Sequence, residues 1–327
     1  MSRYGINCKY GINLGYLVLT KSWIIVLVKS EGKEMDLRRF NLSYDQIVTA
    51  KQCLNYQPFI ISDEVITGVA YSWLHHQDGG RRTYGLHEFV FDRAIEAEDV
   101  WDKAYDANRR LATMYDCLLD HVAERFRGCS LADMACNNGY FVVGAALRGL
   151  SKCTGFDHGD YSSSMSFLSS LTGVDVEFRQ RSYDSWTHIV KDFEPHDIVV
   201  ASQIMQHISD PLYFLSFIAS RAKKALLLFT GMGDTDEFLM YYQQPNRFYK
   251  DASFPVCFDN DVGLSRGLLF KSLDMLGFDE IVEIPWQESW LSKSWYGSQK
   301  VLLCMRKKRP YFHHHRGVDK RTILRWV

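Results

Sequence analysis

Short apolar segments alternate with helix-forming segments along residues 130–305, and this alternation restricts the possible folds more than any other feature of the sequence. Strands that alternate with helices form parallel sheets that are covered on both faces. The last two apolar segments lie close enough along the chain to pair antiparallel. We therefore predict an α/β fold, with a doubly wound, seven-stranded sheet that ends in an antiparallel hairpin. Its strands are expected at residues 131–135, 152–156, 174–178, 198–201, 225–229, 278–284 and 299–305.

The first hundred residues have a mixed pattern, which predicts an α+β extension of that sheet. Residues 16–28 are typical of strands, and residues 43–55 of a helix that Ser43 caps. Between residues 98 and 126, apolar side chains recur every three or four positions, which predicts one long amphipathic helix. This helix leads into the first strand without a flexible linker. We therefore expect residues 71–115 to cover the active site, although padding of the sheet edge explains their pattern equally well.

These patterns divide the chain into three parts. We expect an N-terminal extension and active-site cover at residues 1–105, the sheet domain at residues 106–305 and a basic tail at residues 306–327.

Composition indicates an ordinary globular protein, because 46% of the residues are hydrophobic and 24% are charged. The early apolar run at residues 23–28 is too short to cross a bilayer, and no signal-peptide pattern precedes it. We therefore expect a cytoplasmic protein without a membrane partner. The 8 cysteines form no C-x-x-C pair and no zinc-finger spacing, so free thiols and no metal site are expected.

The net charge of −1 is unevenly distributed along the chain. The tail after residue 305 has eight Lys and Arg against one Asp, so it carries about +7 and leaves the preceding chain at about −8. The main body is thus a poor partner for nucleic acid, and only the tail leaves such a contact open.

The first strand of the sheet runs into the loop DMACNNGY at residues 133–140, and a helix follows at once. Such a turn exposes backbone N–H groups and suits a nucleotide-like ligand. Here the sequence resembles the class I S-adenosylmethionine-dependent methyltransferases, whose loop reads D-x-G-x-G-x-G. Ala135 and Asn137 replace two of the glycines. The resemblance implies a Rossmann-like fold with S-adenosylmethionine as cofactor, bound by Asp133, Ala135, Asn137 and Gly139.

The ends of the second and third strands extend this cofactor site. A carboxylate at Asp157 can accept both ribose hydroxyls of a nucleoside, although capping of the next helix is an alternative role. His158 follows it and is expected to flank the adenine or to face solvent. The resemblance also places Ser182 and Tyr183, which follow the third strand, beside the adenine.

The fourth strand carries the most specific match, DIVVASQIMQHISDPL at residues 197–212. Methyltransferases commonly show D-V-V-x-x-x-x-V-L-x-H-L-x-D-P at this point, which implies that Ser202 and Gln203 contact the cofactor. His207 is the candidate general base for a hydroxyl acceptor, and a structural histidine is the alternative. The nearest subgroup resembles the tRNA wobble-uridine carboxymethyltransferases, which carry Tyr before this His. Gln206 stands there instead, which favours ordinary S-adenosylmethionine, and we assign it to the substrate.

An aromatic-rich insertion at residues 231–263 follows the fifth strand, where such enzymes build their acceptor pocket. Tyr242 and Arg247 are therefore assigned to the substrate. We predict a methyltransferase that acts on a small or medium-sized organic acceptor. A tRNA-modifying enzyme, a non-catalytic cofactor-binding relative and another nucleotide-binding α/β protein are the alternatives, and the oligomeric state stays open.

Overall fold

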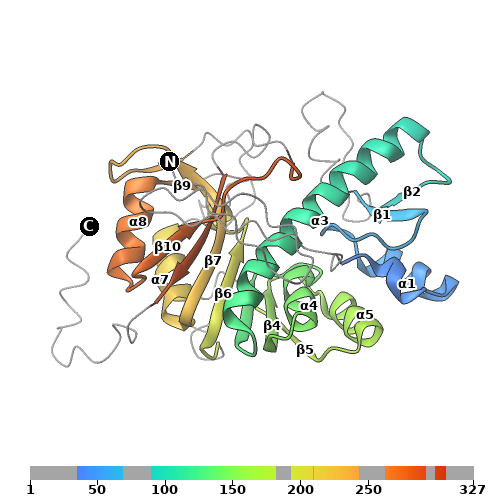
Figure 1. Cartoon of the computed structure of the whole chain (residues 1–327), viewed down its shortest axis with the longest axis horizontal. Helices are drawn as coiled ribbons and strands as arrows, with labels where there is room; N and C mark the ends of the chain where they lie inside the picture. Colours follow the sequence, from blue (N-terminus) through green and yellow to red (C-terminus); the bar gives the residue numbers. More distant parts are fainter. Residues whose placement is uncertain are drawn as a thin grey trace, which may run out of the picture. The chain divides into compact units, whose positions relative to one another are not determined.

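The computed structural model describes residues 35–68, 90–181, 193–208, 210–242, 262–291 and 299–306 (Figure 1). The strands expected at residues 16–28 and the basic tail beyond Arg306 lie outside these residues.

Seven strands form the main sheet in the order β10-β11-β7-β6-β3-β4-β5. The five strands from β7 to β5 run parallel, and β11 is antiparallel to both β7 and β10. The predicted doubly wound sheet with its terminal antiparallel hairpin is therefore confirmed. The strands are β3 (Ser130–Met134), β4 (Ser151–Asp157), β5 (Val176–Gln180), β6 (His196–Ser202), β7 (Ala222–Gly233), β10 (Glu280–Glu283) and β11 (Gln299–Met305).

Two further short strands, β8 (Met240–Tyr242) and β9 (Val262–Ser265), extend the sheet from the end of β7. They border the aromatic-rich insertion, and the sequence analysis did not anticipate them. Strands of three and four residues are too short for a period of two to stand out.

Helices cover both faces of the sheet. Successive side chains of a strand point to opposite faces, so a strand that is apolar throughout needs a packed layer on each side. Ile198 and Val200 of β6 pack into the core beneath α3 and α4, whereas Val199 and Ala201 pack into the core beneath α7 and α8. The helices are α3 (Glu98–Phe126), α4 (Tyr140–Leu147), α5 (Ser162–Thr172), α7 (Pro211–Arg221) and α8 (Arg266–Met275).

The long helix α3 has the bounds that the sequence predicted, and it buries the predicted apolar face. It crosses residue 105, where the sequence analysis placed a domain boundary. Gly128, with φ at 77°, supplies the turn that leads into β3.

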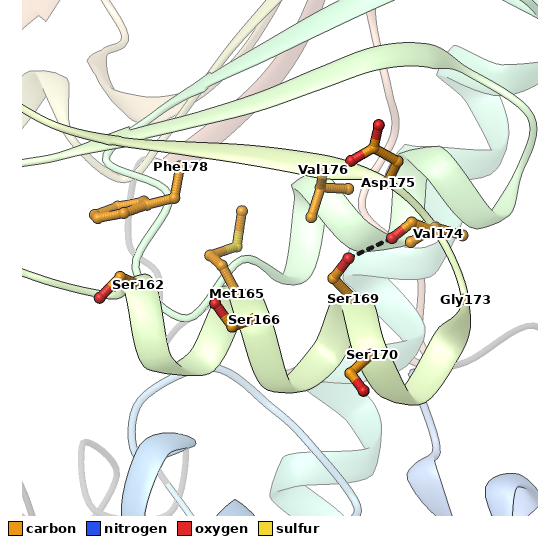
Figure 2. Close-up of a pocket in the computed structure, with 10 residues that line it drawn as sticks. All are labelled: Ser162, Met165, Ser166, Ser169, Ser170, Gly173, Val174, Asp175, Val176 and Phe178. Atoms are coloured by element: carbon orange, nitrogen blue, oxygen red, sulfur yellow. Dashed lines mark hydrogen bonds between the residues drawn. The ribbon is translucent and has the colours of Figure 1, made fainter.

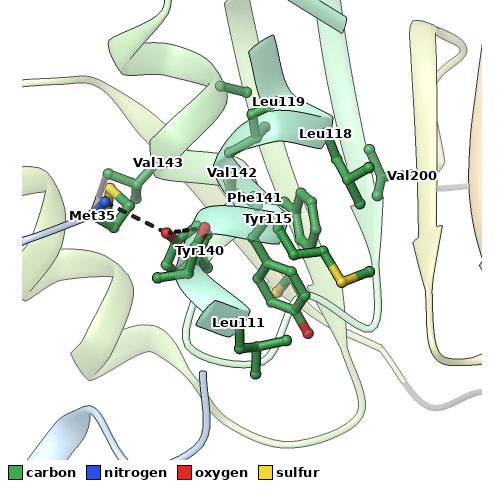
Figure 3. Packing of buried hydrophobic residues seen from close by; sticks show 14 of the residues in the cluster. Met35, Leu111, Tyr115, Leu118, Leu119, Tyr140, Phe141, Val142, Val143 and Val200 are labelled. Atoms are coloured by element: carbon green, nitrogen blue, oxygen red, sulfur yellow. Dashed lines mark hydrogen bonds between the residues drawn. The ribbon is translucent and has the colours of Figure 1, made fainter. Parts of the chain in front are cut away.

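The described part of the N-terminal extension contains a 3-10 helix (Leu37–Phe40), α1 (Tyr44–Cys53) and the antiparallel pair β1 (Val65–Thr67) and β2 (Val90–Asp92). Ser43 caps α1 in a capping box with Gln46, as the sequence predicted for Ser43. Leu54 and Phe59 belong to the same buried cluster as Tyr140 of α4 (Figure 3 shows the neighbourhood of Tyr140). The extension thus shares the hydrophobic core of one face of the sheet.

Candidate active site

The loop between β3 and α4 has positive φ angles at three alternating positions, with 71° at Ala135, 46° at Asn137 and 90° at Gly139. These are the positions at which the resembling methyltransferases have glycine. An alanine in the left-handed region costs about 1–2 kcal/mol, so the surrounding structure must impose this backbone path. A Cβ atom at Gly139 would also overlap the Met165 sulfur, so a larger residue there would strain the backbone and displace the Met165 side chain.

Asp157, at the end of β4, is buried and joins this strand to the loop. One carboxylate oxygen accepts the Asn137 backbone N–H at 2.9 Å, and the other accepts the Gly159 N–H at 3.0 Å. Nδ1 of His158 lies 3.1 Å from the same carboxylate, while the His158 side chain remains 72% exposed. Asp157 therefore has a fixed orientation at the carboxyl ends of the parallel strands.

Asp133 is only 1% exposed, and neither of its carboxylate oxygens has a hydrogen-bond partner among the described residues. Burial, and then the charge of Asp157, raise the pKa of Asp133 well above its ordinary value. A buried carboxyl group without a hydrogen bond is costly, and a cationic ligand group would compensate it. Asp133 is therefore a buried carboxyl group, unsatisfied within the described structure, at the end of β3 just before the loop that leads to α4.

A cavity of about 260 Å³ opens at the carboxyl ends of β3, β4 and β6. In an α/β sheet, ligands bind in this place because the loops that follow the strands converge there. The lining residues are Tyr56, Gln57, Tyr115, Ala135, Asn137, Phe141, Asp157, His158, Ser202, Gln203, Ile204 and His207.

A larger groove of about 670 Å³ lies between α5 and β5 (Figure 2). It is wide open, and serine side chains of α5 such as Ser166 and Ser170 line it together with Val176 and Phe178. None of the predicted site residues lines this groove. We therefore place the candidate site in the smaller cavity, because of these two it is the one that lies at the strand ends where the described loops converge.

No family model matches the chain. The chain is 30% identical over 108 residues to the ubiquinone biosynthesis O-methyltransferase of Marinobacter nauticus, over 32% of this chain and 45% of that protein. It is 26% identical over 138 residues to the protein of the same name from Hahella chejuensis, over 40% of this chain and 57% of that protein. The chain thus spans about half the length of the curated relatives it matches.

Among solved structures, magnesium protoporphyrin IX methyltransferase from Synechocystis PCC 6803 is 12% identical, with a TM-score of 0.43 over 73% of this chain and 95% of that one. Two kinds of observation decide the fold and the relationship of this chain. One is its strand order and loop conformation, and the other is its similarity to the two O-methyltransferases. This chain has the class I S-adenosylmethionine-dependent methyltransferase fold and is a distant homologue of the ubiquinone biosynthesis O-methyltransferases.

Within this methyltransferase fold, the cavity brings together many of the residues that the sequence pointed out. Asp133 and Gly139 do not line the cavity but shape its loop, whereas Ser182, Tyr183 and Arg247 lie outside the described residues. Tyr242 belongs to β8, and its side chain is not described. The predicted residues that line the cavity are Ala135, Asn137, Asp157, His158, Ser202, Gln203 and His207.

Gln206, which the sequence analysis assigned to the substrate, does not line the cavity of the methyltransferase fold. Its Nε2 donates to the backbone oxygen of Gln203 at 3.1 Å and to Oε1 of Gln203 at 2.9 Å. Gln203 has φ at 57°, and its own Nε2 donates to Oε1 of Gln299 at 2.9 Å. Gln206 therefore supports the backbone turn that presents Gln203 to the cavity.

Sequence reasoning missed three polar residues of the cavity, Tyr56, Gln57 and Tyr115. Tyr115 lies on the apolar face of α3 and lines the cavity together with Ser202. The sequence did offer one signal for Tyr115. A tyrosine on the buried, apolar face of a helix indicates a polar partner or site nearby, because a buried hydroxyl needs a hydrogen-bond partner. Tyr56 and Gln57 follow α1, and no local pattern marks them.

Two further observations concern metals and membranes. No group of three or more His, Cys, Asp or Glu side chains in the described part of the chain could hold a metal ion. The described helices also include none that is long and apolar enough to span a bilayer.

Proposed function

We propose that this protein is an S-adenosylmethionine-dependent methyltransferase that acts on a small or medium-sized organic acceptor by in-line methyl transfer. The observation that carries the proposal is the loop with three positive φ angles, which the buried Asp157 carboxylate ties to the end of β4 at 2.9 Å. The distant O-methyltransferase relatives support the same activity.

Two carboxyl groups would hold the cofactor from opposite ends. Asp157 would accept the ribose hydroxyls, since each of its oxygens has a second lone pair beyond the backbone N–H that it already accepts. Asp133 does not line the cavity, so it would act electrostatically on the ammonium group of the methionine part from its position two residues before Ala135, and its oxygens lack partners in the described structure. The bound cofactor would supply a methyl group activated by a sulfonium centre.

The protein's own contribution would be alignment and exclusion of water. Tyr56, Tyr115 and Phe141 provide ring surface on the walls of the cavity. His207 is exposed at the same cavity and would take the proton of a hydroxyl acceptor. The names of the relatives support oxygen as the methylated atom.

A tRNA acceptor with a carboxylated cofactor is the second candidate. The loop resembles that of the wobble-uridine carboxymethyltransferases, and the tail carries about +7. A steep loss of RNA affinity with increasing salt would support this candidate. Tighter binding of the carboxylated cofactor than of S-adenosylmethionine would show that our interpretation of Gln206 is wrong.

Calorimetric titration with S-adenosylhomocysteine tests the proposal. The wild-type protein should bind it, and Asp157→Ala should weaken binding several-fold or more, because two ribose hydroxyls lose a charged acceptor. Asp175→Ala, which removes an exposed carboxylate at the edge of the α5–β5 groove, is the matched control and should bind as the wild type does. Absence of binding to the wild type, or unchanged binding to Asp157→Ala, would contradict the proposal.

A further inference from the structure

The loop between β3 and α4 (residues 135–139), which we call the cofactor loop, is hydrogen-bonded through side chains to the end of α1, although the two lie more than 80 residues apart in the sequence. Asn138 of the loop is 0% exposed. Its Oδ1 accepts the backbone N–H of Asn55 at 3.2 Å and that of Tyr56 at 2.8 Å, and its Nδ2 donates to the Cys53 carbonyl at 2.9 Å. One amide side chain thus satisfies three backbone groups at the end of α1.

Gln57 makes the reciprocal contact, in which a side chain of the segment after α1 binds the backbone at the start of α4. It is 6% exposed, and its Oε1 accepts the backbone N–H of Tyr140 at 2.8 Å. Tyr140 is the first residue of α4, so its N–H is one of the donors at the start of the helix that have no intrahelical partner. Gln57 therefore satisfies, from a distant segment, a backbone donor that the helix itself leaves open.

Tyr56 lies between these two contacts and lines the cavity together with Asn137 and Asp157. Burial, and then the charge of Asp157, raise the pKa of Tyr56 to about 12. Its phenol keeps its proton at neutral pH, as that of an ordinary tyrosine does, and can donate a hydrogen bond. Asn138 itself does not line the cavity, but it holds the backbone of the segment that carries Tyr56.

We propose that Asn138 is a positioning residue that, together with Gln57, holds the Tyr56 side chain against the bound cofactor. The inference rests on the proposed function and extends it, since it makes residues 53–57 part of the cofactor site. Tyr56 is then a binding residue for the nucleoside part of the cofactor, because it lies beside the carboxylate assigned to the ribose. Cofactor binding in turn stabilises the attachment of this segment to the loop.

A double-mutant cycle on S-adenosylhomocysteine affinity tests this inference in the full-length protein. Asn138→Ala should weaken binding about tenfold in the wild-type background. An effect of this size is typical when a change at one site alters affinity at another. In the Tyr56→Ala background the same change should weaken binding by about twofold or less, because the side chain through which it acts is gone. Gln52→Ala, which removes an exposed amide of α1, is the control and should leave the affinity unchanged.

An equal loss in both backgrounds would overturn the inference, since general loosening of the protein does not depend on Tyr56. If Asn138→Ala does not fold, the more conservative Asn138→Ser takes its place in the cycle with the same expected pattern. Hydrogen exchange provides a second measurement, in which the ligand should slow exchange of the Asn55 and Tyr56 amides, and unchanged exchange would contradict the coupling. Failure of the wild type to bind the ligand would instead count against the proposed function.

Discussion

At the scale of single residues, Asp133 lowers the stability of the ligand-free folded protein. Its carboxyl group is buried beside Asp157 and has no hydrogen-bond partner in the described structure. The folded protein therefore holds a proton on Asp133 at pH values at which the unfolded chain releases it. Sites that bind charged ligands commonly carry such a stability cost.

Asp133→Asn should stabilise the ligand-free protein, and the gain should depend on pH. The pKa of Asp133 is raised in the folded state, so the folded state binds more protons and the free energy of unfolding falls as pH rises above about 4. The neutral amide removes this loss. Thermal unfolding from pH 4 to pH 8 should show a Tm advantage for the variant that increases with pH, and a constant difference would contradict this assignment.

At the scale of elements, a buried ion cluster joins α3 to α4. The Arg148 side chain is 2% exposed, and its Nη2 and Nε lie 2.7 Å from carboxylate oxygens of Asp116 and Asp120, respectively. Its Nη1 also donates to the Gly144 carbonyl at 3.1 Å. Because α4 begins at the cofactor loop, this cluster fixes the helix that orients the loop.

Arg148→Met should lower the free energy of unfolding by about 3–5 kcal/mol, because it leaves buried carboxylates without their cation. Denaturant unfolding measures this loss. The control is Arg109→Met on α3. Arg109 forms a half-exposed ion pair with Asp106 at 3.3 Å, which should contribute about 1 kcal/mol at most to stability. Similar losses for the two variants would show that the buried cluster has no special role.

At the scale of the whole molecule, the N-terminal extension and the sheet share one core. Phe59 of the extension is fully buried, and its ring lies 5.4 Å from that of Tyr140 in α4. Leu37 and Leu54 belong to the same cluster as Leu111 of α3 and Leu131 of β3. A shared core of this kind couples the extension to the sheet when the protein unfolds.

Phe59→Ala should destabilise the whole protein by about 3–5 kcal/mol, since it leaves a cavity between the extension and α4. Unfolding followed by circular dichroism and by tryptophan fluorescence should give one coincident transition for the wild type and for the variant. Tyr44→Ala, at a side chain that is 79% exposed, is the control and should change stability little. Two separate transitions would show that the extension folds by itself.

Local patterns in the sequence were sufficient to predict the order of the elements and part of the site. Apolar periodicity predicted the observed bounds of α3, since periodicity records which side of a helix is buried. The small-residue run at residues 140–147 predicted α4, and the apolar run at residues 299–305 predicted β11. Asp157 and the loop of Asn137 were found because a strand end and the turn after it are contiguous in sequence. Their hydrogen bond follows from the pairing of neighbouring parallel strands.

Tertiary structure alone decided which distant segments complete the site. Tyr56 and Gln57 have no local signal, and they reach the cavity because Asn138, 82 residues after Tyr56, binds the backbone around them. Gln206 lies in a motif that predicted a substrate contact, and only the tertiary structure shows that its amide hydrogen-bonds Gln203. The physical reason is that periodicity and motif spacing record local burial, whereas hydrogen-bond partners between segments depend on how packed elements meet in space.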